Sequence, residues 1–281
     1  KAGKELGIEV VWKGSQVEND LKGEIDVVEN FISQNISGIA LAPQDHKAMV
    51  NPVHDAMAAK IPVLIWDSDL DGQAPNDFVS FVATDNFAAG QLAADALGKA
   101  LGGKGKVAML RYLEGSASTA KREDGFLDGL KKHYPDIKVV SENQYAGPST
   151  ESAFAKSESL LASVKAPSGG IQGVYAPNES AAFGMLLALR KIGLAGKIKF
   201  VGFDTSTKLL EGLRAGEING LVAQDPFNMG YLAVKTLVSA IKGEKVEPRI
   251  DTGAKVITKE NIEDPAIKEL LTPDLKKWLQ E

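Results

Sequence analysis

Short apolar runs alternate with longer amphipathic stretches along nearly the whole chain, and no other feature of the sequence limits the fold as much. The runs are rich in Val, Ile and Leu and too continuous for strands with one wet face, so they predict strands covered on both faces. Repeated strand–helix–strand units are typical of parallel sheets joined by crossover helices. The predicted strands are residues 8–12, 38–42, 61–66, 79–83, 106–111, 137–141, 173–176, 199–203 and 220–223, and the predicted helices are residues 21–34, 47–59, 87–101, 120–133, 151–164, 180–192, 208–215 and 229–241.

The chain length indicates two such units. A chain of 281 residues exceeds the ~100–200 residues that usually surround one hydrophobic core. The first four predicted strands and the later five each suit one open α/β layer set. Residues 1–6 have the pattern of a helix end, and in this repeat a helix follows a strand. We therefore expect the first strand of the first unit to be lacking in this chain.

Composition and charge exclude several classes of protein. Hydrophobic residues at 44% and charged residues at 25% are typical of a globular chain and not of a disordered one. A net charge of -5 without a basic block argues against nucleic acid as a partner. The chain has no Cys, which excludes disulfides and thiolate metal sites, and its apolar runs fall short of the ~20 residues of a membrane span.

Polar residues follow most of the predicted strands. In an open parallel sheet the ligand crevice lies beyond the carboxyl ends of the strands, so these residues are candidates for a binding site. The alternative is that strand ends are polar because they lead into loops. Amides and carboxylates are well represented among them, which suits a neutral ligand with many hydroxyl groups. The candidates are Gln44, Asp45, Asp67, Ser68, Asp69, Asp85, Asn86, Arg111, Tyr112, Glu114, Ser116, Gln144, Tyr145, Asn178, Glu179, Asp204, Gln224 and Asp225.

Signatures of catalysis and of nucleotide cofactors are missing from the sequence. The three His residues have no metal-ligand spacing, and no G-x-S-x-G motif is present. The G-x-G-x-x-A match at residues 103–108 precedes a predicted strand, whereas a dinucleotide fingerprint must follow one. We therefore predict a protein that is not an enzyme and has no cofactor.

Residues 67–72 have the sequence DSDLDG and begin like a calcium loop of the D-x-D-x-D-G type. The bidentate acid expected at the twelfth position is replaced by Phe78, and the flanking segment is a predicted strand instead of a helix. Ligand hydrogen bonding by Asp67 is the favoured interpretation, and no metal site is predicted.

Six short segments, spread over nearly the whole chain, carry a resemblance to a known family. They are IPVLIWD at 61–67, TDN at 84–86 with AG at 89–90, REDGF at 122–126, APNE at 176–179, VGFD at 201–204 and AQDP at 223–226. With these segments the chain resembles the periplasmic sugar-binding proteins of ABC transporters, of the ribose-binding type. That family shares its fold with the cores of lactose-repressor-type regulators.

The resemblance implies an α/β fold with two Rossmann-like lobes, joined by a hinge of three segments and closing on one sugar. The N-terminal lobe is expected to hold residues 1–84 and 226–252. The C-terminal lobe is expected to hold residues 85–225 and 253–281, with the ligand cleft between the lobes.

The resemblance also implies the site residues. Those expected to hydrogen-bond sugar hydroxyls are Asp67, Asn86, Asn178, Asp204 and Gln224, and Tyr145 is expected to stack on the sugar ring. Arg122 matches a family arginine and is included in the site, although we interpret it mainly as structural.

Two arginines of ribose binders are replaced here, by Ser68 and Ala120, so ribose itself is not predicted. Arg111, Lys121 and Ser118 are candidates to replace their contacts, and Ser118 is included among the ligand-binding residues.

The favoured hypothesis is a monomeric solute-binding protein that captures a monosaccharide or polyol and delivers it to the membrane permease of an ABC transporter. It would be periplasmic, or extracellular and lipid-anchored. The alternative is the ligand-sensing core of a transcriptional regulator or a chemosensory protein. An α/β enzyme that uses a nucleotide is disfavoured because the glycine motif and a base–nucleophile pair are missing.

Overall fold

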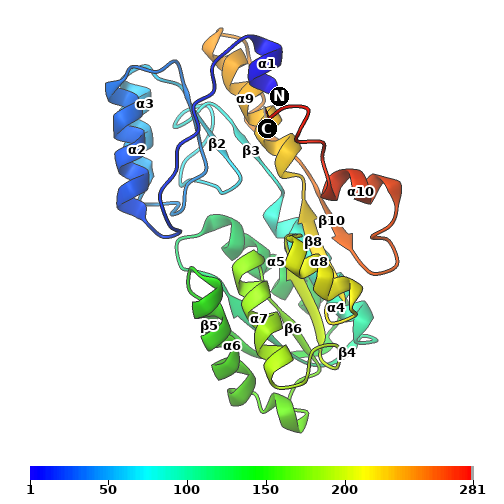
Figure 1. Cartoon of the computed structure of the whole chain (residues 1–281). Coiled ribbons are helices and arrows are strands. Elements are labelled where there is room, and N and C mark those ends of the chain that lie inside the picture. The colour runs from blue at the N-terminus through cyan, green and yellow to red at the C-terminus, as the bar shows by residue number, and fades with distance from the viewer. Residues whose placement is uncertain (280–281) are drawn as a thin grey trace.

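Two separate β-sheets, each covered by helices on both faces, make up the computed structural model, which describes residues 1–279 (Figure 1). All neighbouring strands are parallel except one pair at the edge of the second sheet. This confirms the predicted α/β class with parallel sheets. Residues 280–281 of the predicted C-terminal lobe lie outside the described residues.

The first sheet, with its helices, is called the first lobe. Its strands are β1 (Ile39–Leu41), β2 (Val63–Trp66), β3 (Phe81–Ala83) and β9 (Arg249–Asp251), in the order β1-β2-β3-β9. Along β2, Val63 and Ile65 pack in one core with α2 (Leu21–Ser33) and α3 (Val50–Ala58). Leu64 points to the opposite face and packs against α9 (Pro226–Ile241), on which α1 (Ala2–Leu6) lies. Both faces of the strand are buried, as its continuous apolar sequence predicts.

The second sheet and its helices form the second lobe, with strand order β10-β8-β7-β6-β4-β5. On one face Val107 and Met109 pack with α4 and α5, and on the other Ala108 and Leu110 pack with α6, α7, α8 and α10. The strands are β4 (Lys104–Arg111), β5 (Asp136–Tyr145), β6 (Gly173–Tyr175), β7 (Lys199–Phe203), β8 (Gly220–Gln224) and β10 (Ala254–Ile257). The helices are α4 (Asn86–Ala100), α5 (Ala117–His133), α6 (Thr150–Ser163), the 3-10 turn η1 (Ala166–Ser168), α7 (Glu179–Lys191), α8 (Thr207–Arg214) and α10 (Pro265–Leu271).

The chain passes between the lobes three times: from β3 to α4, from β8 to α9, and from β9 to β10. Two of these passages are hydrogen-bonded to each other. Thr84 Oγ1 donates to the carbonyl oxygen of Gly253 over 3.1 Å, and the backbone N–H of Asp85 donates to the Asp251 carboxylate over 2.9 Å. The passage after β8 adjoins them, because the end of β8 pairs with the start of β10.

The strand predicted at residues 8–12 is wrong. This segment is extended but pairs with no described strand, and β1 pairs only with β2. A cavity of about 450 Å³, lined by Trp12, Phe31 and Leu41 among others, lies between the segment and the first sheet. Val11 and Trp12 are 53% and 78% exposed. A β-branched run forms a strand only where a partner satisfies its backbone, and this segment has none among residues 1–279.

Helices α4 and α5 pack closely because small residues face each other. A Cβ atom at Gly90 would overlap the carbonyl oxygen of Arg122, and one at Gly125 would overlap the carbonyl oxygen of Phe87. The two backbones therefore approach more closely than alanines would allow. This approach places Arg122, on the second turn of α5, beneath the gap between the lobes.

We expect Gly125→Ala to lower the free energy of unfolding by about 1–3 kcal/mol, because the added methyl group must push the two helices apart. The matched control is Gly230→Ala in α9, where no atom lies within 4 Å of the added Cβ. That change should raise the free energy of unfolding by about 0.5–1 kcal/mol, since alanine loses less backbone entropy in a helix. Urea unfolding of both variants checks the pair, and equal effects would contradict the close approach.

Candidate functional site

A polar cavity of about 250 Å³, called here the first cavity, lies between the carboxyl ends of the two sheets. Six of the eight predicted site residues line it: Asp67, Ser118, Arg122, Asn178, Asp204 and Gln224. The other lining residues are Glu18, Asn19, Ala42, Pro43, Gln44, Asp45, Ser68, Tyr112, Leu113, Glu114, Ser116 and Thr119. The lining therefore comes from both lobes, as the positions of the strand ends predict.

Asp67 and Asp204 occupy equivalent positions in the two lobes. Asp67 directly follows β2 and Asp204 directly follows β7, with φ angles of 63° and 69°. This left-handed conformation costs a residue with a side chain about 1–2 kcal/mol, although Asn and Asp tolerate it best. Such strain concentrates at functional sites because the surrounding structure must hold it in place.

The carboxylate of Asp67 accepts no hydrogen bond from any residue that the structure describes. The pKa of this carboxyl is raised above its ordinary value, because the effect of burial, with a smaller rise from the Asp204 carboxylate, exceeds the lowering by the nearby Arg122 guanidinium. The carboxyl is half-buried at the cavity wall, so its oxygens have acceptor capacity that a ligand can use.

Asp204 is held by its own lobe. Its Oδ2 accepts the backbone N–H of Glu179, at the start of α7, over 3.1 Å, and its Oδ1 accepts Gln224 Nε2 over 2.8 Å. This leaves Gln224 Oε1 buried with no hydrogen-bond partner among the described residues. Leaving such an acceptor unmatched costs about 1–3 kcal/mol, and a donor from a ligand in the cavity would remove the cost.

Arg122 is the cation of the first cavity and is only 3% exposed. Its Nε donates to Asn86 Oδ1 over 2.8 Å and one terminal nitrogen donates to the carbonyl oxygen of Pro177 over 3.0 Å. Its guanidinium carbon lies 3.9 Å from the centre of the Phe203 ring. Asn86 therefore fixes Arg122 in place, and Asn86 itself does not line the first cavity.

Asn178 lies at the cavity wall as the N-cap of α7. Its Oδ1 accepts the backbone N–H of Ala181 over 3.3 Å, and its Nδ2 donates to Ser180 Oγ over 3.2 Å. One hydrogen of the side-chain amide remains for a ligand.

Three residues considered in the sequence analysis lie away from the first cavity. Tyr145 ends the edge strand β5, is 37% exposed and lines a separate open groove with Lys156. Arg111 is held by the Glu123 carboxylate over 2.6 Å, and Lys121 lines a neighbouring cavity instead.

Glu18 and Asn19 line the first cavity although sequence analysis did not select them. They belong to the irregular segment before α2. The backbone N–H of Asn19 donates to Gln44 Oε1 over 2.5 Å, and the hydroxyl of Tyr112 donates to the Glu18 carboxylate. Among sequence signals, only the Asn-Asp pair at the start of the helix marks this segment.

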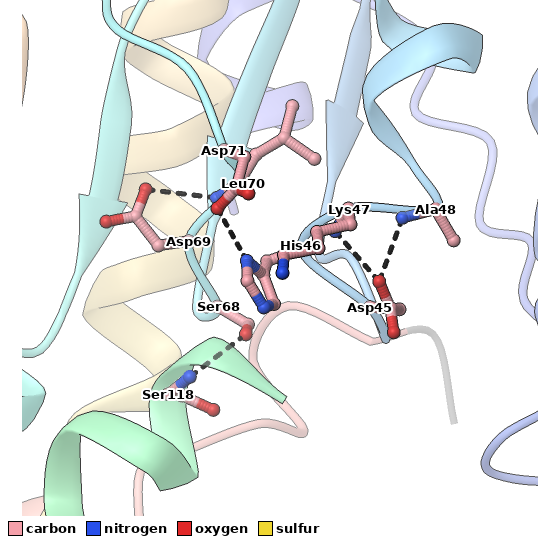
Figure 2. A network of polar contacts seen from close by, with 9 residues as sticks. All are labelled: Asp45, His46, Lys47, Ala48, Ser68, Asp69, Leu70, Asp71 and Ser118. Atoms are coloured by element: carbon pink, nitrogen blue, oxygen red, sulfur yellow. Dashed lines mark hydrogen bonds and ion pairs between the residues drawn. The ribbon is translucent and has the colours of Figure 1, made fainter. Parts of the chain in front are cut away.

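The two lobes touch each other beside the first cavity. The backbone N–H of His46 donates to the carbonyl oxygen of Gly115 over 3.0 Å. The backbone N–H of Ser118, at the start of α5, donates to Ser68 Oγ over 3.3 Å, as Figure 2 shows. Gly115 has a φ of 89°, and a Cβ atom there would overlap the Asp45 carboxylate. The lobes are therefore in a closed arrangement.

Loops of the first lobe are stiffened on their side of this contact. In Figure 2 the Asp45 carboxylate accepts the backbone N–H groups of Lys47 and Ala48, each over 2.8 Å. His46 Nδ1 lies 2.5 Å from the Asp71 carboxylate. The loops after β1 and β2 are thus linked to each other through His46 and Asp71 where they contact the second lobe.

Within residues 1–279, no cluster of three or more acidic or His side chains is arranged to hold a metal ion. In the same part of the chain, no helix has the length and hydropathy needed to cross a membrane.

A two-lobed binding protein, with one polar cavity that both lobes line, is the class that this fold and site define. The family described as periplasmic binding protein domain matches residues 1–245 of the chain. The chain therefore belongs to the periplasmic binding protein family, which is a family of binding proteins and not of enzymes.

Individual relatives are similar over nearly their whole length. The chain is 31% identical to the ribose import binding protein of Haemophilus influenzae, over 92% of this chain and 84% of that protein. A carbohydrate transporter solute binding protein from Agrobacterium radiobacter, solved in complex with D-arabinose, is 37% identical with a TM-score of 0.89, covering 96% of this chain and 90% of that chain. An ABC transporter solute binding protein from Agrobacterium vitis with bound D-fucose is 34% identical with a TM-score of 0.88, covering 96% and 93%. These comparisons confirm the predicted ribose-type family and favour a solute-binding protein over a regulator.

Glu24 on α2 is a buried carboxyl, 7% exposed, that lines the cavity between the N-terminal segment and the first sheet. Its carboxylate accepts the backbone N–H of Gln44. Burial raises the pKa of Glu24 to about 7, the Gln44 N–H opposes this shift, and the Asp45 carboxylate adds to it.

We expect Glu24 to make the protein less stable as the pH rises from about 4.5 to about 7. In this range the unfolded chain has lost the proton and the folded chain keeps it, so the free energy of unfolding falls with pH. Glu24→Gln should remove this loss and be more stable than the natural chain at pH 8, by at most about 3 kcal/mol, with little difference at low pH. Urea unfolding over this pH range measures the effect.

Glu29→Gln, at an exposed position of the same helix, is the matched control and should leave the pH profile unchanged. Identical pH profiles for Glu24→Gln and the natural chain would contradict the raised pKa.

Proposed function

We propose that the protein captures one neutral monosaccharide or polyol in the first cavity and delivers it to the permease of an ABC transporter. The observation that carries the proposal is that the cavity holds unused acceptors from both lobes. Gln224 Oε1 of the second lobe is buried without a hydrogen-bond partner among the described residues. The half-buried Asp67 carboxyl of the first lobe lines the same cavity and accepts no hydrogen bond from residues 1–279. A sugar hydroxyl both donates and accepts, so a sugar can satisfy both groups at once.

The charge of the cavity favours a neutral ligand. Five carboxylates line it, against the single guanidinium of Arg122, which already donates to protein acceptors. An anion would meet like charges in a partly buried site, and like charges there cost several kcal/mol. The carboxylates are Glu18, Asp45, Asp67, Glu114 and Asp204.

A ligand bound by both lobes would hold them closed. It makes its full set of hydrogen bonds only when Asp67 and Asp204 face the same cavity, and this difference in binding free energy shifts the population to the closed state. The three passages between the lobes would act as the hinge, with residues 1–84 and 226–252 moving against residues 85–225 and 253–281.

The choice of sugar would differ from that of ribose binders. Ser68 uses its hydroxyl to accept the backbone N–H of Ser118, and Ala120 is exposed outside the cavity. Neither position presents a guanidinium to the ligand. The relatives solved with D-arabinose and D-fucose make pentoses and deoxyhexoses the first candidates.

The proposal also covers the oligomeric state, the location and the protein partner. We infer a monomer, because one chain supplies both walls of the cavity. It would act in the periplasm or be held at the membrane surface by a lipid anchor, with the permease as its protein partner. No nucleic acid or cofactor takes part.

Asp67→Ala and Asp204→Ala should each weaken sugar binding about tenfold or more, because a hydrogen bond to a charged group contributes about 1.5–3 kcal/mol. The sugar is first identified by a thermal-shift screen of pentoses, hexoses and polyols, and affinities are then measured by calorimetry.

Asp225→Ala is the matched control. Asp225 also follows a strand, but its carboxylate caps α9 by accepting the N–H of Asn228 over 2.9 Å. Loss of this cap should lower the free energy of unfolding by about 1 kcal/mol and leave sugar affinity unchanged. Unchanged affinity in both the Asp67 and Asp204 variants, or a screen without any stabilising sugar, would rule out the proposed site.

A further inference from the structure

A second cavity of about 270 Å³ lies beside the first, where α4, α5 and β9 meet. Ser118 lines both cavities, so the two cavities adjoin at this residue. The second cavity also has walls from both lobes, because Lys121 comes from α5 and Arg249 from β9. None of the functions proposed above uses this cavity.

Two buried side chains in the second cavity have hydrogen-bond donors to spare. Asn86 is 7% exposed and its Oδ1 accepts from Arg122, which leaves its NH₂ group without an acceptor among the described residues. Ser118 is 8% exposed, and its hydroxyl has no partner in residues 1–279. Both side chains line the second cavity, so an acceptor that enters it can take hydrogen bonds from them.

Two cationic side chains, Lys121 and Arg249, also line the second cavity. Lys121 forms no ion pair or hydrogen bond with any residue that the structure describes. Arg249 lies over the Phe81 ring, and one terminal nitrogen of its guanidinium is 3.3 Å from Asp69 Oδ2. A charged group that enters the cavity from solvent can therefore pair with Lys121 directly.

Most acceptors of the second cavity are already engaged. Asp69 accepts the backbone N–H of Leu70 over 3.0 Å and faces Arg249. Asp85 accepts the backbone N–H of Ala88 over 3.0 Å and so caps α4. The spare groups are therefore the donors of Asn86 and Ser118, the cation Lys121 and the second oxygen of Asp85, whereas the first cavity has an excess of carboxylates.

We propose that the second cavity binds a carboxylate group through Lys121 Nζ, Ser118 Oγ and Asn86 Nδ2. A single negative charge fits best, because Arg249 already faces Asp69 and Lys121 is the cation of this cavity that has no ion pair among the described residues. The group is either a small organic acid or the acid end of a sugar acid whose hydroxyls occupy the first cavity.

A bound carboxylate would also favour the closed arrangement. It would contact α5 of the second lobe and lie beside Arg249 of the first lobe, so it binds the closed state better than the open one. By linkage it should then raise the affinity for sugar, and sugar should raise the affinity for the carboxylate. This coupling rests on the proposed function, whereas binding of the carboxylate to the sugar-free protein does not.

The test compares sodium acetate with sodium chloride at equal ionic strength. Acetate should raise the melting temperature of the sugar-free protein above its value in chloride. Lys121→Gln should lose this rise, because its affinity for acetate falls about tenfold with the loss of one charged hydrogen bond. Lys131→Gln, the same change at an exposed position on α5, should keep it. Equal melting temperatures in the two salts, or an acetate effect retained in Lys121→Gln, would overturn the proposal.

A second experiment distinguishes a small organic acid from a sugar acid as the ligand that carries the carboxylate. D-arabinose and D-arabinonate are titrated into the natural protein and into Lys121→Gln. A sugar acid as ligand predicts that D-arabinonate binds more tightly than D-arabinose, and that Lys121→Gln removes this advantage. A separate small acid predicts instead that acetate tightens the binding of D-arabinose.

Failure of this inference and failure of the sugar site are distinguishable. If neither acetate nor D-arabinonate responds to Lys121→Gln while neutral sugars bind in chloride, the second cavity is not a carboxylate site and the sugar site stands. If Lys121→Gln removes the effect of acetate and no neutral sugar binds, the second cavity is a carboxylate site and the proposed sugar site is wrong.

Discussion

The buried guanidinium of Arg122 is the interaction on which the first cavity depends. Three contacts hold it from one side: the Asn86 amide, the Pro177 carbonyl oxygen and the Phe203 ring. Burial and the Asp204 carboxylate raise the pKa of Asp67, and the charge of Arg122 limits this rise. Without this cation the pKa of Asp67 would rise further. The close approach of α4 and α5, made possible by Gly90 and Gly125, places the guanidinium there.

Much of the fold could be predicted because its strands are buried on both faces. The run at residues 61–66 contains β2 and the run at residues 199–203 coincides with β7, since covered strands leave continuous apolar sequence. The run at residues 8–12 has the same composition and forms no strand. Composition reports what a strand can bury, but pairing depends on a neighbour that the local sequence does not reveal.

The candidate site could be predicted in part for a similar reason. Parallel strands end at one edge of their sheet, so Asp67, Asp204 and Gln224 lie at the first cavity. Tyr145 is the last residue of the edge strand β5, and its position along the chain does not show that β5 lies to one side of the cleft. Glu18 comes from an irregular segment that periodicity cannot place. The direction of Asn86, toward Arg122 and the second cavity, depends on how α4 packs against α5.

The central claim is that one sugar, bound by both lobes, holds them closed. The chain has no Cys, so Glu29→Cys on α2 and Lys156→Cys on α6 provide unique attachment points at exposed positions, one in each lobe. The measurement is the distribution of distances between spin labels at these positions, without sugar and with saturating sugar. The account predicts a broad distribution that shifts to shorter distances and narrows when the sugar binds. A distribution that stays unchanged while calorimetry shows the sugar bound would contradict it.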